Sequence, residues 1–237
     1  MQKVFITVAC ILSIYIILQT IYSAFYFRRA AKISKVRFED KLEKGVKDEP
    51  RLNFTVTGDS VGVGVGATIF DTSLAGRLVS LLSEKNYVIF NNLSKSGAKM
   101  SDLESLQIPT EKQNLIVIVI SSNDLFRFTN PNKFKTSTKN VLEKYSKLSD
   151  KVVVVGPGRV FDAAAVPIPL RLIYKIQAPK YAQILNDEAQ NFPNISHINP
   201  VNPPVNPKNY KGRPSFDRFH PSDDDYIFWF DMVKTAL

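Results

Sequence analysis

The hydrophobic pattern of the chain begins with a continuous apolar run near the N-terminus. Residues 4–27 have the sequence VFITVACILSIYIILQTIYSAFYF and contain no charged side chain. As an α-helix this run is about 36 Å long, enough to cross a hydrocarbon layer of about 30 Å. Aromatic rings, which favour the headgroup region, gather at its C-terminal end as Tyr22, Phe25, Tyr26 and Phe27. The pattern predicts a transmembrane anchor over residues 1–27.

Three other interpretations of this run are a cleaved signal peptide, a lipoprotein signal and a buried core helix. No small-x-small cleavage site stands near Ser23 and Ala24, where the preceding residue is Tyr22. Cys10 lies inside the run rather than at its end, and the run has no polar face. We therefore favour an uncleaved, single-pass N-terminal anchor.

Residues 28–51 carry many charges of both signs and few large apolar side chains, which predicts a charged juxtamembrane tether. Its first part is basic, with Arg28, Arg29, Lys32, Lys35 and Arg37. By the positive-inside tendency these cations favour a cytoplasmic catalytic domain, whereas an envelope substrate would favour the opposite side. The side of the membrane therefore stays open.

Beyond the tether, short β-rich runs alternate with helix-like stretches. We expect strands at 53–57, 87–91, 115–121, 151–155 and 195–199. We expect helices near 71–84, 133–148, 180–190 and 223–237. The run 115–120 is continuously apolar, as in a parallel strand that is covered on both faces. The alternation predicts an α/β fold for residues 52–237, a three-layer α/β/α sandwich with a mostly parallel sheet.

The stretch 163–170, AAAVPIPL, does not fit this alternation, because it is apolar and contains two prolines. We expect it to be a packed crossover loop. The alternatives are an apolar flap near a site and a patch that dips into lipid.

The chain has 237 residues and a formal net charge of +9, with a single cysteine, Cys10, and two histidines, His197 and His220. An intramolecular disulfide and a cysteine-based zinc cluster are therefore excluded. The sequence contains no glycine-aromatic RNA motif, zinc finger or basic zipper, so we expect no nucleic-acid partner. Cations beside an apolar span are typical of contact with membrane lipid, here through residues 4–27 and the basic flank.

The sequence VTGDSVGVGVGA, residues 56–67, places a glycine-rich turn between a predicted strand and a predicted helix. Such a turn can bind a phosphate or present a nucleophile. The spacing Gly62-Val-Gly64-Val-Gly66, with no lysine after it, fits neither a P-loop nor a dinucleotide fingerprint. The nucleophile hypothesis therefore remains, with Ser60 at the carboxyl end of the strand.

A serine nucleophile needs a base and a group that orients the base, and the C-terminal segment offers both. Asp217 stands three residues before His220, a spacing that places two side chains on one side of a turn. Asp217 could then fix one imidazole nitrogen while the other takes the proton of Ser60. The structural alternatives are a cap role for Ser60 and a surface pair of Asp217 and His220 ahead of the last helix.

Four sequence blocks resemble the SGNH, or GDSL-type, esterase and lipase superfamily, from about Phe54 to the C-terminus. They are Gly58-Asp59-Ser60, Asn92 to Ala98, Ser121-Ser122-Asn123-Asp124, and Asp217-x-x-His220-Pro-Ser. The chain departs from the family at Ser121, where glycine is usual.

The resemblance implies an ester hydrolase that works through an acyl-enzyme. It assigns the catalytic roles to Ser60, His220 and Asp217, and the oxyanion hole to Ser60, Gly97 and Asn123. It implies no metal or organic cofactor. The expected partner is an ester substrate, a lipid or an acylated cell-envelope glycan.

Two hypotheses compete with catalysis. The same fold could be a weak or inactive enzyme that serves as an envelope-binding module. Alternatively, the chain could be a membrane-tethering scaffold in which the basic segment 28–51 is the working part.

Overall fold

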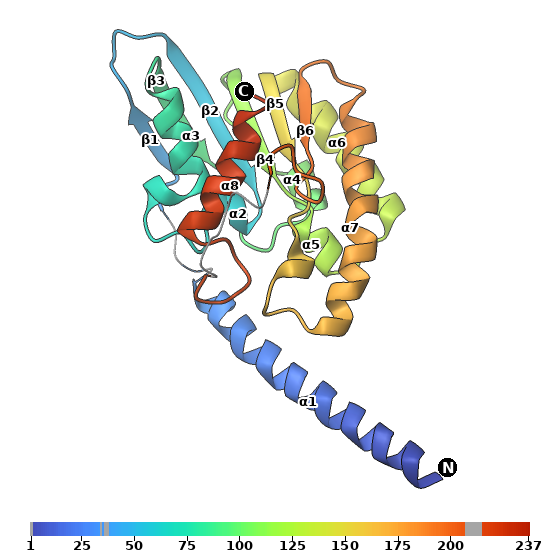
Figure 1. Ribbon diagram of the computed structural model, residues 1–237. Helices are drawn as coiled ribbons and strands as arrows, with labels where there is room; N and C mark the ends of the chain where they lie inside the picture. The colour runs from blue at the N-terminus through green and yellow to red at the C-terminus, as the bar shows by residue number, and fades with distance from the viewer. Residues whose placement is uncertain (1, 34, 36–37, 207–214) are drawn as a thin grey trace.

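The computed structural model describes residues 2–33, 35, 38–206 and 215–237. Within these residues six strands form one sheet in the order β1-β3-β2-β4-β5-β6 (Figure 1). The strands are β1 (Lys41–Lys44), β2 (Arg51–Gly58), β3 (Tyr87–Asn92), β4 (Gln113–Val119), β5 (Ser149–Val155) and β6 (Ile195–Ile198). β1 runs antiparallel to β3, and the other neighbouring pairs are parallel. The predicted mostly parallel sheet is confirmed.

Helices cover both faces of the sheet (Figure 1). One face carries α4 (Met100–Glu104), α5 (Ser122–Phe126), α6 (Pro131–Leu148) and α7 (Ile168–Ala189). The other face carries α2 (Ser60–Val63), α3 (Leu74–Leu82) and α8 (Asp223–Lys234). Two short 3-10 turns, η1 (Phe70–Thr72) and η2 (Val160–Asp162), complete the domain. This is the three-layer α/β/α sandwich expected from the sequence.

The continuous apolar run of β4 is explained by burial on both sides. Ile116 and Ile118 belong to the core beneath α6 and α7, while Val117 and Val119 belong to the core beneath α3 and α8. Because successive strand residues point to opposite faces, a strand covered by helices on both sides needs apolar residues at every position.

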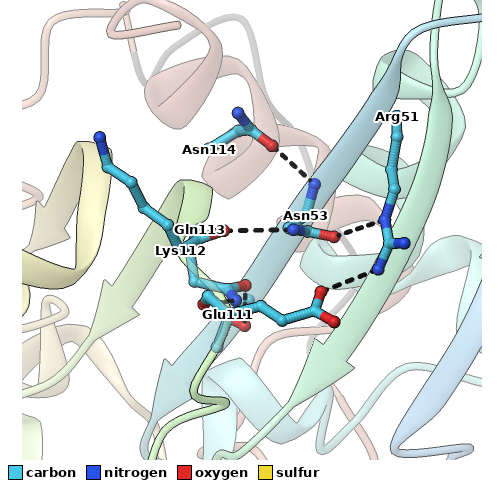
Figure 2. A network of polar contacts seen from close by, with 7 residues as sticks. Arg51, Asn53, Glu111, Lys112, Gln113 and Asn114 are labelled. Carbon is cyan, nitrogen blue, oxygen red and sulfur yellow. Dashed lines mark hydrogen bonds and ion pairs between the residues drawn. The ribbon is translucent and has the colours of Figure 1, made fainter.

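A polar network fixes the amino ends of β2 and β4 (Figure 2). The backbone N–H of Asn53 donates to Asn114 Oδ1 at 2.9 Å, and Asn53 Nδ2 donates to the carbonyl of Lys112 at 3.1 Å. Arg51 donates to Asn53 Oδ1 and forms an ion pair with Glu111 at 2.8 Å. These bonds hold the register in which Gly58 lies beside Val119 at the opposite, carboxyl edge.

α1 (Gln2–Ile33) leaves the domain and extends away from it (Figure 1). Its residues Lys3–Ile33 are long and apolar enough to cross a membrane, although a signal sequence near an N-terminus meets the same criterion. The predicted anchor lies within this helix, apart from Met1, which is outside the described residues, as is Arg37 of the basic flank.

The structure adds the short helices α2, α4 and α5 to the expected elements, extends α1 to Ile33, and differs most in two further segments. The predicted tether contains strand β1, whose exposed residues pair with the edge of β3. The expected crossover loop at 163–170 ends early, because α7 begins at Ile168 and not near residue 180. Pro167 caps this helix and Pro169 lies in its first turn, where a missing N–H costs nothing. Pro179 lies inside α7, and packed residues on both sides of it keep the helix continuous.

The turn after β4 contains an unusual serine. Ser121 is buried and has φ of 83° and ψ of −10°, the left-handed region that favours glycine. Its hydroxyl donates to the carbonyl of Ile120. The position at which the chain departs from the usual family glycine thus keeps the glycine-like backbone conformation.

We expect Ser121→Gly to raise the free energy of unfolding by about 1 kcal/mol, because a left-handed serine stores strain that glycine does not. For a domain of this size the melting temperature should rise by about 2–4 °C. The matched change Ser83→Gly, at φ of −75°, should lower the melting temperature instead. Equal effects at the two positions would contradict the assignment of strain to Ser121.

Candidate active site

Ser60 lies at the carboxyl edge of the sheet, as the first residue of α2 directly after β2. The sharp turn depends on Gly58, whose φ is 131° and where an added Cβ would lie 1.8 Å from the carbonyl oxygen of Val119. No other residue type fits this position. The strand therefore ends abruptly, and Ser60 is presented half-buried at the end of the sheet.

Asp59, the residue before Ser60, is buried and bonded to backbone groups. Its N–H donates to the carbonyl of Val119 at 2.8 Å, and its Oδ1 accepts from Val61 N at 3.0 Å to cap α2. Burial raises the pKa of Asp59 to about 7, since the Val61 hydrogen bond only partly offsets the loss of water and the Asp124 charge adds to the rise.

His220 and Asp217 form a buried pair. His220 Nδ1 lies 2.6 Å from Asp217 Oδ2. The other oxygen of Asp217 accepts from Ser215 Oγ at 2.8 Å and from the backbone N–H groups of Phe219 and His220, each at 3.0 Å. Burial alone would raise the pKa of Asp217, but the hydrogen bond and charge of His220 and the backbone hydrogen bonds from Phe219 and His220 outweigh it and lower the pKa to about 2. Asp217 is therefore a carboxylate at neutral pH, and the surface-pair alternative is wrong because both side chains are buried.

The glycine-rich turn packs directly against the segment that carries His220. A Cβ at Gly66, whose φ is 97°, would lie 2.1 Å from the carbonyl oxygen of Pro221. The hydroxyl of Tyr226 in α8 donates to the carbonyl of Val65 at 2.8 Å. Asp223 at the start of α8 accepts from Thr68 N at 2.9 Å. The glycines thus allow two distant segments, 60–68 and 220–226, to approach closely.

A cavity of about 360 Å³ opens beside this junction. Ser60 and His220 both line it. Much of the remaining wall is apolar, formed by Val61, Val160, Ala163, Ala164, Phe219, Phe228 and Trp229. Ala163 and Ala164 come from the apolar stretch before α7, so part of that stretch does border the site. Ser60 and His220 therefore border one cavity with a largely apolar wall, while Asp217 is buried behind His220.

The two other predicted oxyanion residues lie next to each other. Asn123 Nδ2 donates to the carbonyl of Ala98 at 3.0 Å, directly after Gly97, which has φ of 82°. Asp124 Oδ2 accepts from Met100 N at 2.8 Å and joins the same two loops. Neither Gly97 nor Asn123 is among the residues that line the cavity, so their part in the site stays a prediction.

Sequence reasoning did not single out Ser215, Ser122 or Trp229. The Ser215 hydroxyl donates to Asp217. The one sequence signal for this contact is that Ser215 stands two residues before Asp217. Ser122 and Trp229 line the cavity, and the Ser122 hydroxyl accepts from Gly158 N at 3.0 Å. Their roles depend on tertiary packing, which local pattern does not report.

His197 lies in β6 and is not among the cavity-lining residues. Burial lowers its pKa to about 4, so its imidazole is neutral at neutral pH. Among the residues that the structure describes, no three His, Cys, Asp or Glu side chains are grouped to hold a metal ion. The expectation that no cofactor is needed stays a prediction.

Comparisons with known proteins agree with the fold. The chain is similar to a catalytic mutant of Axe2, an acetylxylan esterase from Geobacillus stearothermophilus, with 14% identity, a TM-score of 0.59, and coverage of 80% of this chain and 95% of that chain. It is similar to TesA with 19% identity, a TM-score of 0.59, and coverage of 78% and 97%. A third similar structure is the psychrotrophic esterase EstA from Pseudoalteromonas sp., with 14% identity, a TM-score of 0.58, and coverage of 78% and 95%.

A comparison with curated proteins finds no significant match. The profile of the GDSL-like Lipase/Acylhydrolase family matches residues 56–226, which is most of the chain and includes all four sequence blocks. The chain therefore belongs to the GDSL-like lipase/acylhydrolase family, a family of carboxylic ester hydrolases.

Proposed function

We propose that the protein is a membrane-anchored serine esterase in which Ser60, His220 and Asp217 hydrolyse carboxylic esters through an acyl-enzyme. The observation that carries this proposal is that His220, paired with the buried Asp217, lines the same cavity as Ser60. Asp217 holds Nδ1 of the imidazole, so Nε2 is the nitrogen available to a serine hydroxyl.

In the first half of the reaction Ser60 Oγ attacks the carbonyl carbon while His220 Nε2 takes the hydroxyl proton. The negative charge of Asp217 stabilises the imidazolium that forms. When the tetrahedral intermediate collapses, the bond to the alcohol oxygen breaks and His220 gives its proton to that oxygen. The alcohol leaves, and the acyl group remains on Ser60.

In the second half a water molecule attacks the acyl carbon and loses a proton to His220 Nε2. Collapse of this intermediate breaks the bond to Ser60 Oγ, which recovers the proton from the histidine. The carboxylic acid leaves, and the enzyme returns to its starting state with no change in oxidation.

Each intermediate carries a negative oxygen that needs hydrogen-bond donors. We assign this task to the backbone N–H groups of Ser60 and Gly97 and to the side-chain amide of Asn123. The bond between Asn123 and the carbonyl of Ala98 supports the assignment, since it holds the Asn123 side chain against the loop that carries Gly97. One amide hydrogen of Asn123 is used in that bond, and the second is the donor we assign to the oxyanion.

The proposed substrate is a lipid ester or an acetylated cell-envelope glycan. The largely apolar wall of the cavity suits an acyl group, and the similar Axe2 is an acetylxylan esterase. The apolar length of α1 supports an anchor that is retained at the membrane. The basic residues that follow the apolar span favour a cytoplasmic domain, while a glycan substrate would require the other side.

Ser60 should react covalently with a fluorophosphonate probe in the full chain held in detergent. We expect Ser60→Ala to abolish labelling and to lower kcat for p-nitrophenyl esters by about 10⁴-fold or more. The matched change Ser122→Ala, at a serine that lines the same cavity, should still be labelled. Absence of labelling in the folded wild type, or labelling that survives Ser60→Ala, would favour the binding-module or scaffold hypothesis.

Asp217→Asn should lower kcat by about 10⁴-fold, because the amide would favour the wrong imidazole tautomer. The substitution should also change how the free energy of unfolding depends on pH in acid. The folded-state pKa of about 2 lies below the ordinary value of 3.8, so ionised Asp217 stabilises the fold above pH 4. This contribution, about 2 kcal/mol, is lost as the pH falls from 4 to 2.

The fluorescence of the single tryptophan, Trp229, can follow urea unfolding of the domain across this pH range. We expect the stability of the wild type to fall more steeply between pH 4 and 2 than that of Asp217→Asn. Parallel curves for the two proteins would mean that Asp217 is not held as a carboxylate in the fold.

Asn123→Ala should lower kcat by about 10²–10³-fold with little change in KM, since an oxyanion donor acts on the intermediate more than on the bound ester. Asn191→Ala, at an exposed asparagine after α7, is the matched control and should leave both constants unchanged. A rise in KM at constant kcat would assign Asn123 to substrate binding instead.

A further inference from the structure

The first half of α7 exposes an apolar face that the proposed reaction does not use. Ile168, Leu172 and Ile176 recur every four residues on one side of the helix, with Ile173 beside them. Leu172 is 61% exposed and Ile176 is 79% exposed. In the second half of the same helix the exposed residues after Pro179 are polar, namely Lys180, Gln183 and Asp187.

This apolar face lies at the end of the domain from which α1 leaves (Figure 1). Tyr174, on the packed side of α7, stacks on Phe126 with 5.5 Å between ring centroids. Phe126 in turn meets Phe27 of α1 at 5.6 Å. Phe128, which is exposed, contacts Tyr174 at 5.5 Å and extends the apolar surface. The start of α7 and the end of α1 are therefore joined through one aromatic cluster.

The contacts of α1 indicate where a membrane surface would lie. The residues from Val4 to Ile21 make an apolar helix of about 27 Å, close to the thickness of a hydrocarbon layer. At the next residue the domain is bonded to the helix, where Arg218 Nη1 donates to Tyr22 Oη at 3.3 Å. The Arg218 guanidinium also lies 5.2 Å from the ring centroid of Tyr26. Tyrosine and arginine side chains at the end of an apolar span are typical of the headgroup region.

Arg218 and its neighbour Phe219 connect the end of the apolar span to the cavity. Arg218 and Phe219 line the cavity, and Phe219 contacts Phe27 of α1 with 5.8 Å between ring centroids. The N–H of Ala165, in the stretch that leads into α7, donates to the carbonyl of Arg218 at 3.1 Å. The cavity wall is thus bonded both to the end of the apolar span and to the segment before the exposed apolar face.

We propose that the first half of α7, together with Phe128, inserts into the same membrane leaflet that receives the C-terminal part of α1. The lipid bilayer is the partner, because the apolar face is continuous with a helix that has the length and composition of a membrane span. Both helices also carry exposed cations that suit anionic headgroups, Arg28 and Lys32 on α1 and Lys175 and Lys180 on α7.

This docking holds the cavity at the level of the headgroups. The inference about the substrate rests on the proposed esterase function. It selects an ester carried by a membrane amphiphile, because the ester bond of such a molecule lies at the level of the headgroups. The docking itself is independent of catalysis and can be measured without an ester.

The depth of α7 can be measured with fluorophores on single cysteines, because Cys10 is the sole cysteine of the chain and Cys10→Ser gives a clean background. The full chain is placed in vesicles of phosphatidylcholine and phosphatidylglycerol. We expect fluorophores at Leu172→Cys and Ile176→Cys to be quenched by nitroxides on lipid acyl chains and protected from aqueous iodide. Asp187→Cys, in the polar half of the same helix, should show the reverse.

Iodide quenching at 172 and 176 equal to that at 187 would overturn the docking. Protection from both quenchers would also overturn it, because it would show a second copy or another part of the chain over this face.

The paired change Leu172→Glu and Ile176→Glu tests the substrate part. Hydrolysis of a long-chain ester dispersed in the vesicles should fall by about tenfold or more, since carboxylates oppose insertion, while hydrolysis of soluble p-nitrophenyl acetate stays the same. Gln183→Glu with Gln190→Glu, both exposed near the far end of α7, should change neither rate. Equal rates on the vesicle ester for both double variants would contradict delivery from the membrane.

The two proposals fail in different ways. If the wild type hydrolyses neither ester and does not react with fluorophosphonate, the esterase function is wrong, and the quenching result still decides the docking. If soluble ester is hydrolysed but positions 172 and 176 lie in water, the docking is wrong and the esterase function stands.

Discussion

The buried carboxylate of Asp217 is the constraint on which the site depends. One of its oxygens gathers the hydroxyl of Ser215 and two backbone N–H groups, and so folds residues 215–220 into a tight loop. The other oxygen lies 2.6 Å from His220 Nδ1 and fixes the imidazole. These donors replace the water that the carboxylate loses on burial, so Asp217 stays ionised. Its negative charge can then stabilise a protonated imidazole. One group thus shapes the loop, orients the imidazole and places a negative charge beside it, as the proposed base requires.

The second constraint is close approach of the backbone at the carboxyl edge of the sheet. Gly58 lies against Val119 on the neighbouring strand, and Gly66 lies against Pro221 of the histidine segment. Side chains at either position would separate the elements that bring Ser60 and His220 to one cavity. The glycine-rich turn is therefore explained by packing, in agreement with the absence of phosphate-binding spacing in its sequence.

Much of this could be predicted from the sequence, because the relevant signals are local. A strand buried on both faces, such as β4, needs apolar residues at every position, and a D-x-x-H turn brings its two side chains together over three residues. Features that depend on distant contacts were missed. Three of the four residues of β1 are exposed and the strand carries no clear apolar pattern, since it is held by backbone pairing with β3. The start of α7 was not predicted for two reasons. Its prolines indicate a loop, and its exposed face is apolar, whereas the exposed face of a helix in a soluble domain is usually polar.

The central claim is that Ser60, His220 and the donors near Gly97 act on one carbonyl group. The most direct test is a crystal structure of the fluorophosphonate adduct. We predict phosphorus bonded to Ser60 Oγ, the phosphoryl oxygen roughly 3 Å from Gly97 N and Asn123 Nδ2, and His220 Nε2 at a similar distance from an ester oxygen. Phosphorus on another residue, or a phosphoryl oxygen that points away from Gly97 and Asn123, would contradict the proposed mechanism.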